Sequence, residues 1–234
     1  AGEGSHRHVV HAPSTEAAWV GLGQVRLEKE RLMEAAECFQ AALKVCPRNV
    51  KAWGNLGLAL ARMAQQPPER QPPDSRPEAS LSSSDRVALA DRALAAFETA
   101  AELSDFETEP LVNSALLLGA LGRHQGAVAN LRKALERALA DRPQGQSRGQ
   151  SGGRLGSEEL LGQRGARRAG RAFDGVGGGG EALSEIYANL GVALCDAGDL
   201  EGAASAFADA LKAFPKHANA RANLSAVRAV LDAK

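Results

Sequence analysis

The stretch Glu16-Ala-Ala-Trp-Val-Gly-Leu-Gly23 returns 34 residues later as Val50-Lys-Ala-Trp-Gly-Asn-Leu-Gly57. In both copies a tryptophan is followed, three and four residues on, by leucine and glycine. Asn189-Leu-Gly191 repeats the end of the pattern near the other end of the chain. A fixed period between about 20 and 50 residues indicates a chain built from stacked copies of one structural unit.

Each unit continues with a second segment in which alanine is followed by phenylalanine or leucine four residues on, and by alanine three residues after that. The four sets are Ala35, Phe39 and Ala42; Ala93, Phe97 and Ala100; Ala127, Leu131 and Ala134; and Ala203, Phe207 and Ala210. Alanine, leucine and the long charged residues, which favour helices, dominate these segments, and no alternating strand pattern is present. The sequence therefore predicts an all-α fold of paired helices.

The period and these residues resemble the tetratricopeptide repeat (TPR), which also ends in a proline such as Pro47 or Pro215. The resemblance implies an α-solenoid of stacked antiparallel helix pairs. Four repeats and a capping helix are expected, at 16–49, 50–107, 108–141, 184–217 and 218–234. Repeat three departs from the pattern, because Leu111-Val-Asn-Ser-Ala115 replaces the aromatic residue, leucine and glycine and its closing proline is missing.

Three segments interrupt the repeats and are predicted to be disordered: a flexible tail at 1–15, a proline-rich insertion at 64–87 and a Gly/Arg-rich insertion at 142–183. Neither insertion has enough apolar side chain to offset the entropy of ordering it. Repeats 1–3 then occupy 16–141, and repeat four with the capping helix occupies 184–234. We expect repeat four to dock on repeat three, because closing the long loop costs only about 3 kcal/mol. The alternative is two separate units.

Small residues are expected where the two helices of a repeat cross. Glycine or alanine there lets the backbones approach closely, and these positions are Gly23, Gly57, Ala115 and Gly191. The phenylalanines of the second helices are expected to fill the gap between neighbouring repeats.

Composition excludes several classes of function. Lysine plus arginine number 28 and aspartate plus glutamate also number 28, so no bulk charge attracts nucleic acid or a membrane. No apolar run reaches the roughly 20 residues of a membrane helix. The three cysteines form no C-x-x-C pair, which favours free thiols in a reducing compartment, the cytoplasm or an organelle. No catalytic, phosphate-binding or metal motif is present, so we predict a protein that is not an enzyme and needs no cofactor.

The first helices of the repeats are expected to line an inner groove. Residues at i, i+4 and i+7 share a helix face, and on this face four asparagines fall at one equivalent position: Asn55, Asn113, Asn189 and Asn223. Lys51, Arg62 and Asp196 complete the predicted partner-binding set. An amide carries both a donor and an acceptor, so a row of amides can hold an extended peptide backbone. The alternative is that these asparagines support helix packing or turns.

Family resemblance also limits the choice of partner. The repeats of O-linked N-acetylglucosamine transferase are similar in using an asparagine row, so a substrate-presenting part of a larger enzyme of that kind is the alternative function. A clamp for a chaperone C-terminal carboxylate requires basic residues where this chain has Val20, Gln24, Glu109 and Asn113. That clamp is therefore not expected. RNA binding through the Arg/Gly insertion is disfavoured, since only Phe173 offers a stacking ring there.

Overall fold

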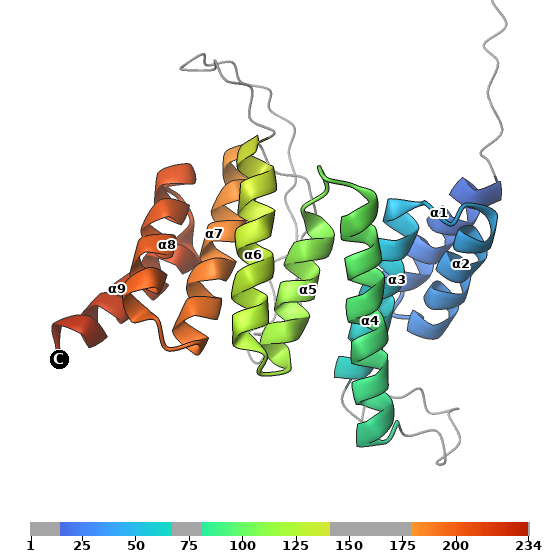
Figure 1. Cartoon of the computed structure of the whole chain (residues 1–234), viewed down its shortest axis with the longest axis horizontal. Helices are drawn as coiled ribbons and strands as arrows, with labels where there is room; N and C mark the ends of the chain where they lie inside the picture. Colours follow the sequence, from blue (N-terminus) through green and yellow to red (C-terminus); the bar gives the residue numbers. More distant parts are fainter. Residues whose placement is uncertain (1–14, 67–80, 141–178, 234) are drawn as a thin grey trace, which may run out of the picture. The chain divides into compact units, whose positions relative to one another are not determined.

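The computed structural model describes residues 15–66, 81–140 and 179–233, and within these ranges it contains nine α-helices and no strand (Figure 1). The helices are α1 (Thr15–Glu28), α2 (Leu32–Val45), α3 (Val50–Gln65), α4 (Ser83–Leu103), α5 (Glu109–Ala120), α6 (His124–Ala140), α7 (Gly179–Asp196), α8 (Leu200–Ala213) and α9 (Ala218–Asp232). This confirms the predicted all-α architecture of helix pairs. None of the helices in these ranges is both long enough and apolar enough to cross a bilayer.

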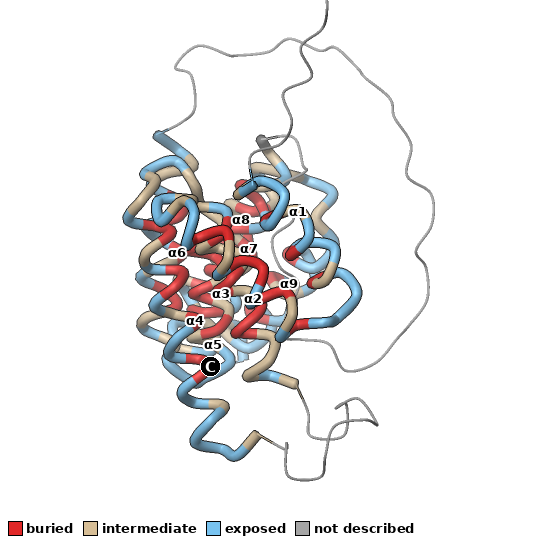
Figure 2. The backbone as a smooth tube through the Cα atoms, turned by 90° about the vertical axis from the view of Figure 1, so that its right-hand side faces the viewer, coloured by how far each residue is buried: buried red, intermediate tan, exposed pale blue. Residues whose placement is uncertain are grey.

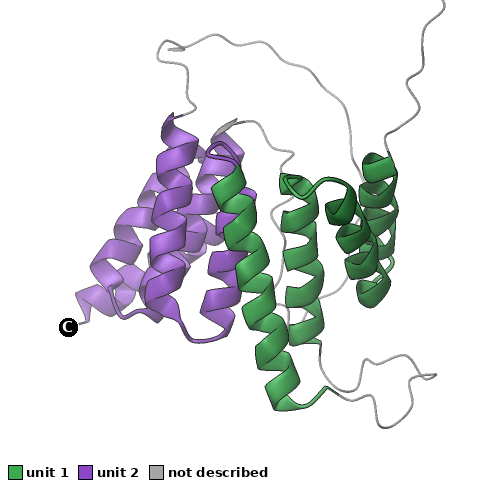
Figure 3. Cartoon of the chain, turned by 45° about the vertical axis from the view of Figure 1, so that its right-hand side comes forward, with its two compact units in different colours: residues 1–103 green, residues 104–234 purple. Residues whose placement is uncertain are grey.

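The chain forms two compact units, residues 1–103 and residues 104–234 (Figure 3). In the first unit α1 packs on α2, α2 on α3 and α3 on α4. In the second unit each helix from α5 to α8 packs on the next one, so α7 does contact α6. First helices also meet directly, because α1 touches α3 and α5 touches α7.

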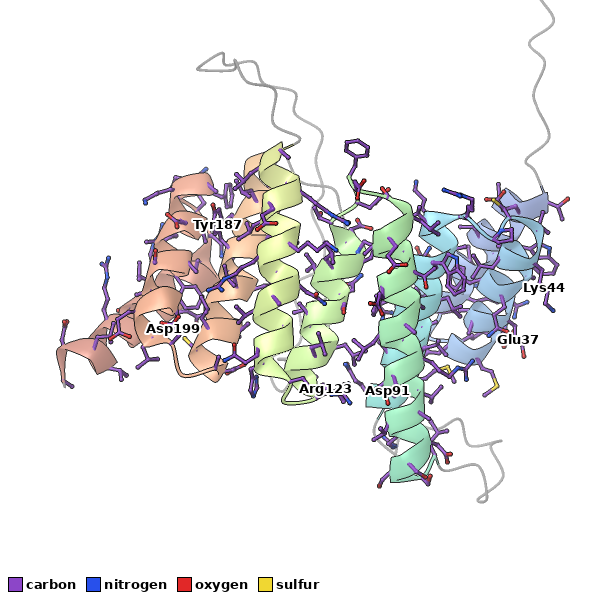
Figure 4. The ribbon with its side chains drawn as sticks, viewed as in Figure 1. Glu37, Lys44, Asp91, Arg123, Tyr187 and Asp199 are labelled. Carbon is purple, nitrogen blue, oxygen red and sulfur yellow. The ribbon has the colours of Figure 1, made fainter. Side chains whose placement is uncertain are left out.

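Local chemistry begins several helices. Asn49 accepts a hydrogen bond from the Ala52 amide (2.8 Å) at the start of α3, and Asp199, labelled in Figure 4, accepts one from the Gly202 amide (2.8 Å) at the start of α8. At the start of α9 the His217 imidazole accepts one from the Ala220 amide (3.1 Å). These side chains satisfy amides that the first turn of a helix leaves unbonded.

The turns inside the helix pairs use backbone conformations with positive φ. Gly122 has φ 72° and Gly198 has φ 86°, which confirms the expected glycine stops after α5 and α7. Repeat one has no glycine there and places Glu30 in the same region, with φ 58°. Glycine adopts this conformation without the clash that a Cβ atom causes.

Within three of the pairs, a buried phenylalanine of the second helix presses on a glycine of the first. A Cβ atom at Gly23 would lie 2.5 Å from the Phe39 ring, and one at Gly191 would lie 2.6 Å from the Phe207 ring. The same atom at Gly57 would lie 2.7 Å from the Phe97 ring. Our expectation that these rings fill the gap between neighbouring repeats is therefore wrong. Each ring fills the space left by the missing Cβ in its own repeat.

Repeat three solves the same crossing with different residues. Ala115 on α5 (2% exposed) and Leu131 on α6 (1% exposed) occupy the positions that glycine and phenylalanine occupy in the other pairs. A branched aliphatic side chain is smaller than a ring, so it leaves room for the alanine methyl group. The departure from the pattern is therefore a matched pair, and the core continues through this repeat (Figure 2).

Helix α4 begins at Ser83, inside the segment expected to be an insertion. Ser82 explains this start, because its backbone amide donates to Asp85 Oδ2 (3.0 Å) and its Oγ accepts from the Asp85 amide (3.1 Å). Hydrogen bonds from the Ser82 hydroxyl, first, and from its backbone amide hold the pKa of Asp85 below its usual value. Arg86 then ties α4 to the end of α3 by donating to the Gln66 carbonyl.

Helix α7 also starts early, at Gly179 rather than at residue 184. Leu183 is buried (5% exposed) and anchors this added turn. The Ser184 hydroxyl, fully buried, donates to the Ala210 carbonyl (2.8 Å) and so joins α7 to α8. The predicted flexible tail and most of both predicted insertions lie outside the described residues.

Candidate functional site

The predicted site residues lie on first helices of both units. Asn113 is on α5, Asn189 and Asp196 are on α7, and Asn223 is on α9, all in the second unit. The first unit holds the other three, Lys51, Asn55 and Arg62, all on α3.

The four asparagines share one environment. Asn55, Asn113, Asn189 and Asn223 are all half-buried, so each amide lies at the surface beside the packed part of its helix. Because α5 contacts α7, Asn113 and Asn189 occupy corresponding positions on neighbouring first helices. In the first repeat this position is Gly21, with open space around its Cα hydrogen. The row therefore begins in repeat two.

None of these four amides forms a side-chain hydrogen bond within the described ranges. Two other asparagines behave differently. Asn49 accepts from the Ala52 amide and donates to the Glu16 carboxylate, and Asn130 donates to the Ser114 hydroxyl (2.9 Å). Support of packing and turns therefore describes Asn49 and Asn130, while the four asparagines of the row keep both donor and acceptor available.

Aliphatic side chains accompany the amides three residues further along each helix. Leu58 and Leu116 are half-buried, and Val192 is 44% exposed. Since residues three apart lie on the same side of a helix, amide and aliphatic groups alternate along this face. Such a face offers hydrogen bonds to a backbone and apolar contact to the side chains beside it.

The charged members of the predicted set differ in their surroundings. Lys51 is exposed in the first turn of α3, and Asp196 is exposed at the last residue of α7. Arg62 is half-buried and forms an ion pair with Glu30, with 3.8 Å between Nη1 and Oε1. Arg62 therefore also holds α3 against the turn that follows α1. Next to Asp196, burial, followed by the charge of Asp196, raises the pKa of the Cys195 thiol.

One surface feature was not predicted. A cleft of about 400 Å³ lies between α2, α3 and α4 in the first unit and is lined by both methionines of the chain, Met33 and Met63. Glu37, labelled in Figure 4, and Asp85 also line it. It exists because α4 starts two turns before the repeat pattern requires, which no periodicity indicates.

No chemistry beyond binding emerges from the part of the chain that the structure describes. There, no group of three or more His, Cys, Asp or Glu side chains is placed to hold a metal ion. The amides and aliphatic groups of the first helices therefore form the best-defined candidate site, and its chemistry is that of peptide recognition.

Comparison with known families locates the repeats independently. Models described as TPR repeat and tetratricopeptide repeat match residues 23–63, 108–141 and 188–231. These ranges include three of the four helix crossings described above. No curated protein sequence matches the chain.

Solved structures share the architecture at low sequence identity. A thermophilic TPR protein of Thermus thermophilus has a TM-score of 0.57 at 17% identity, with 92% of this chain and 82% of that chain covered. PilF of Pseudomonas aeruginosa has a TM-score of 0.59 at 13% identity, with coverage of 91% and 67%. YrrB, described as a TPR protein with an unusual peptide-binding site, has a TM-score of 0.51 at 17% identity, with coverage of 89% and 74%. At these identities the likeness concerns the fold alone.

Proposed function

Because the chain belongs to the tetratricopeptide-repeat proteins, whose models match about half of its length, we propose that it is a scaffold without catalytic activity of its own. In this proposal it binds a segment of a partner protein along the inner face of its first helices. The partner segment is extended, so that its backbone groups reach the asparagine amides.

The observation that carries the proposal is the hydrogen-bonding state of the row. Four amides at one repeat position are half-buried and have no partner within the described residues. A typical hydrogen bond contributes about 0.5–1.5 kcal/mol net, so three such amides together can account for about a ten-fold or larger change in affinity. Because each amide meets backbone atoms, the contribution depends little on the sequence of the partner.

Aliphatic groups on the same face supply selectivity. Leu116 on α5 and Val192 on α7 each lie three residues after an asparagine. An extended segment held by its backbone presents alternate side chains to the surface below it. The face therefore favours segments with small or aliphatic residues at alternate positions. The peptide-binding site named for YrrB supports a peptide as the kind of ligand.

A peptide selection tests the proposal. The full chain is immobilised, binders are selected from a phage-displayed library of random dodecapeptides, and dissociation constants of the selected peptides are measured. Replacing Asn113, Asn189 and Asn223 by alanine is expected to weaken binding about ten-fold or more. Circular dichroism verifies that the variant folds.

Gln125→Ala/Ser205→Ala is the matched control, because it removes exposed polar groups from the second helices α6 and α8 of the same unit. This control is expected to bind like the original chain. Equal affinity of the triple asparagine variant would refute the proposed role of the row and leave the fold untouched.

A further inference from the structure

The first helix of the chain exposes apolar side chains that later first helices bury. Trp19, Leu22 and Val25 follow one side of α1 and are 37%, 40% and 46% exposed, and we call them the α1 end face. In α3 the residues one repeat later include Leu56 and Ala59, which are 6% and 0% exposed. The same kind of surface is therefore open on α1 and covered on α3.

A second helix of the preceding repeat provides the cover in each covered case. Helix α2 packs on α3, α6 packs on α7 and α8 packs on α9. The corresponding residues of α7, Leu190 and Ala193, are each 7% exposed. Those of α9, Leu224 and Val227, are also each 7% exposed. Internal repetition thus shows what fits this surface, and the fitting element is a helix.

A hydrogen bond points to the same missing element. The indole Nε1 of Trp53 donates to the Pro47 carbonyl (2.8 Å), two residues after α2 ends. Arg221, at the corresponding place in α9, donates to the Pro215 carbonyl, two residues after α8 ends. The indole N–H of Trp19 has no such acceptor among the described residues. The absent acceptor is a carbonyl in the turn that follows a covering helix.

We infer that the α1 end face is a docking site for a helix of a partner protein, which takes the place of a preceding second helix. The α2 and α6 helices define its chemistry, since both carry a buried apolar pair seven residues apart, Ala36 with Leu43 and Val128 with Leu135. The partner helix carries such a pair and ends in a turn whose carbonyl accepts the Trp19 indole N–H. This surface is separate from the asparagine row.

Other occupants fit less well. A second copy of the chain would have to supply a second helix, yet α2, α6 and α8 each already pack between two first helices. The fourteen residues before α1 contain Val9 and Val10 as their only branched aliphatic residues, and no two aliphatic side chains among them lie seven apart. A helix from another protein meets both requirements.

The test uses the exposed tryptophan as its own reporter. The chain contains two tryptophans, so a full-length Trp53→Phe variant reports only on Trp19. The probe is a synthetic peptide with the sequence of residues 32–48, which includes α2 and the carbonyl of Pro47. Titration is expected to give a saturable blue shift of the Trp19 emission, because the helix removes the indole from water.

Two matched changes identify the surface. The same peptide with aspartate in place of both Ala36 and Leu43 is expected to give no shift, and Leu22→Asp/Val25→Asp in the protein is expected to abolish the shift caused by the original peptide. No saturable shift, or an equal shift with the aspartate peptide, would overturn the inference. A concentration-dependent blue shift without peptide, together with a doubled mass in light scattering, would also overturn it in favour of a second copy. Loss of the asparagine row leaves this readout unchanged, so the two proposals can fail separately.

Discussion

Two positions that are two residues apart on the same first helix serve opposite purposes. On α7, a Cβ atom at Gly191 would lie 2.6 Å from the Phe207 ring, whereas Asn189 is half-buried and unbonded among the described residues. On α3, Gly57 and Asn55 repeat the arrangement. Two residues along a helix correspond to a rotation of about 200°. One side of each first helix is therefore fixed by packing, and the other side is left for a partner.

The largest effect is expected inside the crossing. Phe39→Ala removes a fully buried ring (0% exposed) and leaves a cavity, so the free energy of unfolding should fall by about 3–5 kcal/mol. Met33→Ala, on the same helix but 63% exposed, should change it by no more than about 0.5 kcal/mol. Urea unfolding followed by circular dichroism measures both variants. Similar losses for the two variants would show that the crossing does not dominate stability.

A smaller effect distinguishes two glycines of α1. Gly23→Ala places a methyl group against the Phe39 ring and should lower the free energy of unfolding by about 1–3 kcal/mol. Gly21→Ala meets nothing within 4 Å and should raise it by about 0.5–1 kcal/mol, because alanine favours helix. Both are measured by the same unfolding experiment.

The rescue of Gly23→Ala sharpens this comparison. Adding Phe39→Leu recreates the pair found in repeat three, Ala115 with Leu131, and should recover part of the loss. A double variant no more stable than the sum of its single changes would contradict the matched-pair explanation.

The smallest effect is expected on the open side. Asn189→Ala should change the free energy of unfolding by no more than about 0.5 kcal/mol, since its amide supports no described contact. Asn49→Ala removes the cap of α3 and should cost about 1 kcal/mol. Thermal unfolding of the two variants provides the measurement. Equal destabilisation would assign Asn189 to folding rather than binding.

The sequence predicted what depends on spacing. Helix pairs, the small residues at Gly23, Gly57 and Gly191, and the glycine turns follow from a period that any stacked helix pair must keep. Contacts could not be predicted in the same way. Whether Phe207 meets its own repeat or the next one depends on how the helices are rotated, which periodicity does not determine.

Helix starts and the state of the site also needed coordinates. The start of α4 depends on a local bond between Ser82 and Asp85, which competes with the proline-rich composition just before it. The face that holds Asn113 and Asn189 was predictable from helical spacing. That their amides lack partners while the Asn130 amide has one depends on neighbours brought close by folding.

Nuclear magnetic resonance of the asparagine side-chain amides tests most directly that the row binds a peptide backbone. A peptide selected on the full chain is added to ¹⁵N-labelled protein, and each amide signal is assigned by single substitution. The signals of Asn113, Asn189 and Asn223 should shift together as the peptide binds, while those of Asn49 and Asn130, already bonded within the fold, should stay in place. Saturable binding that leaves the three row signals unmoved would contradict the proposal.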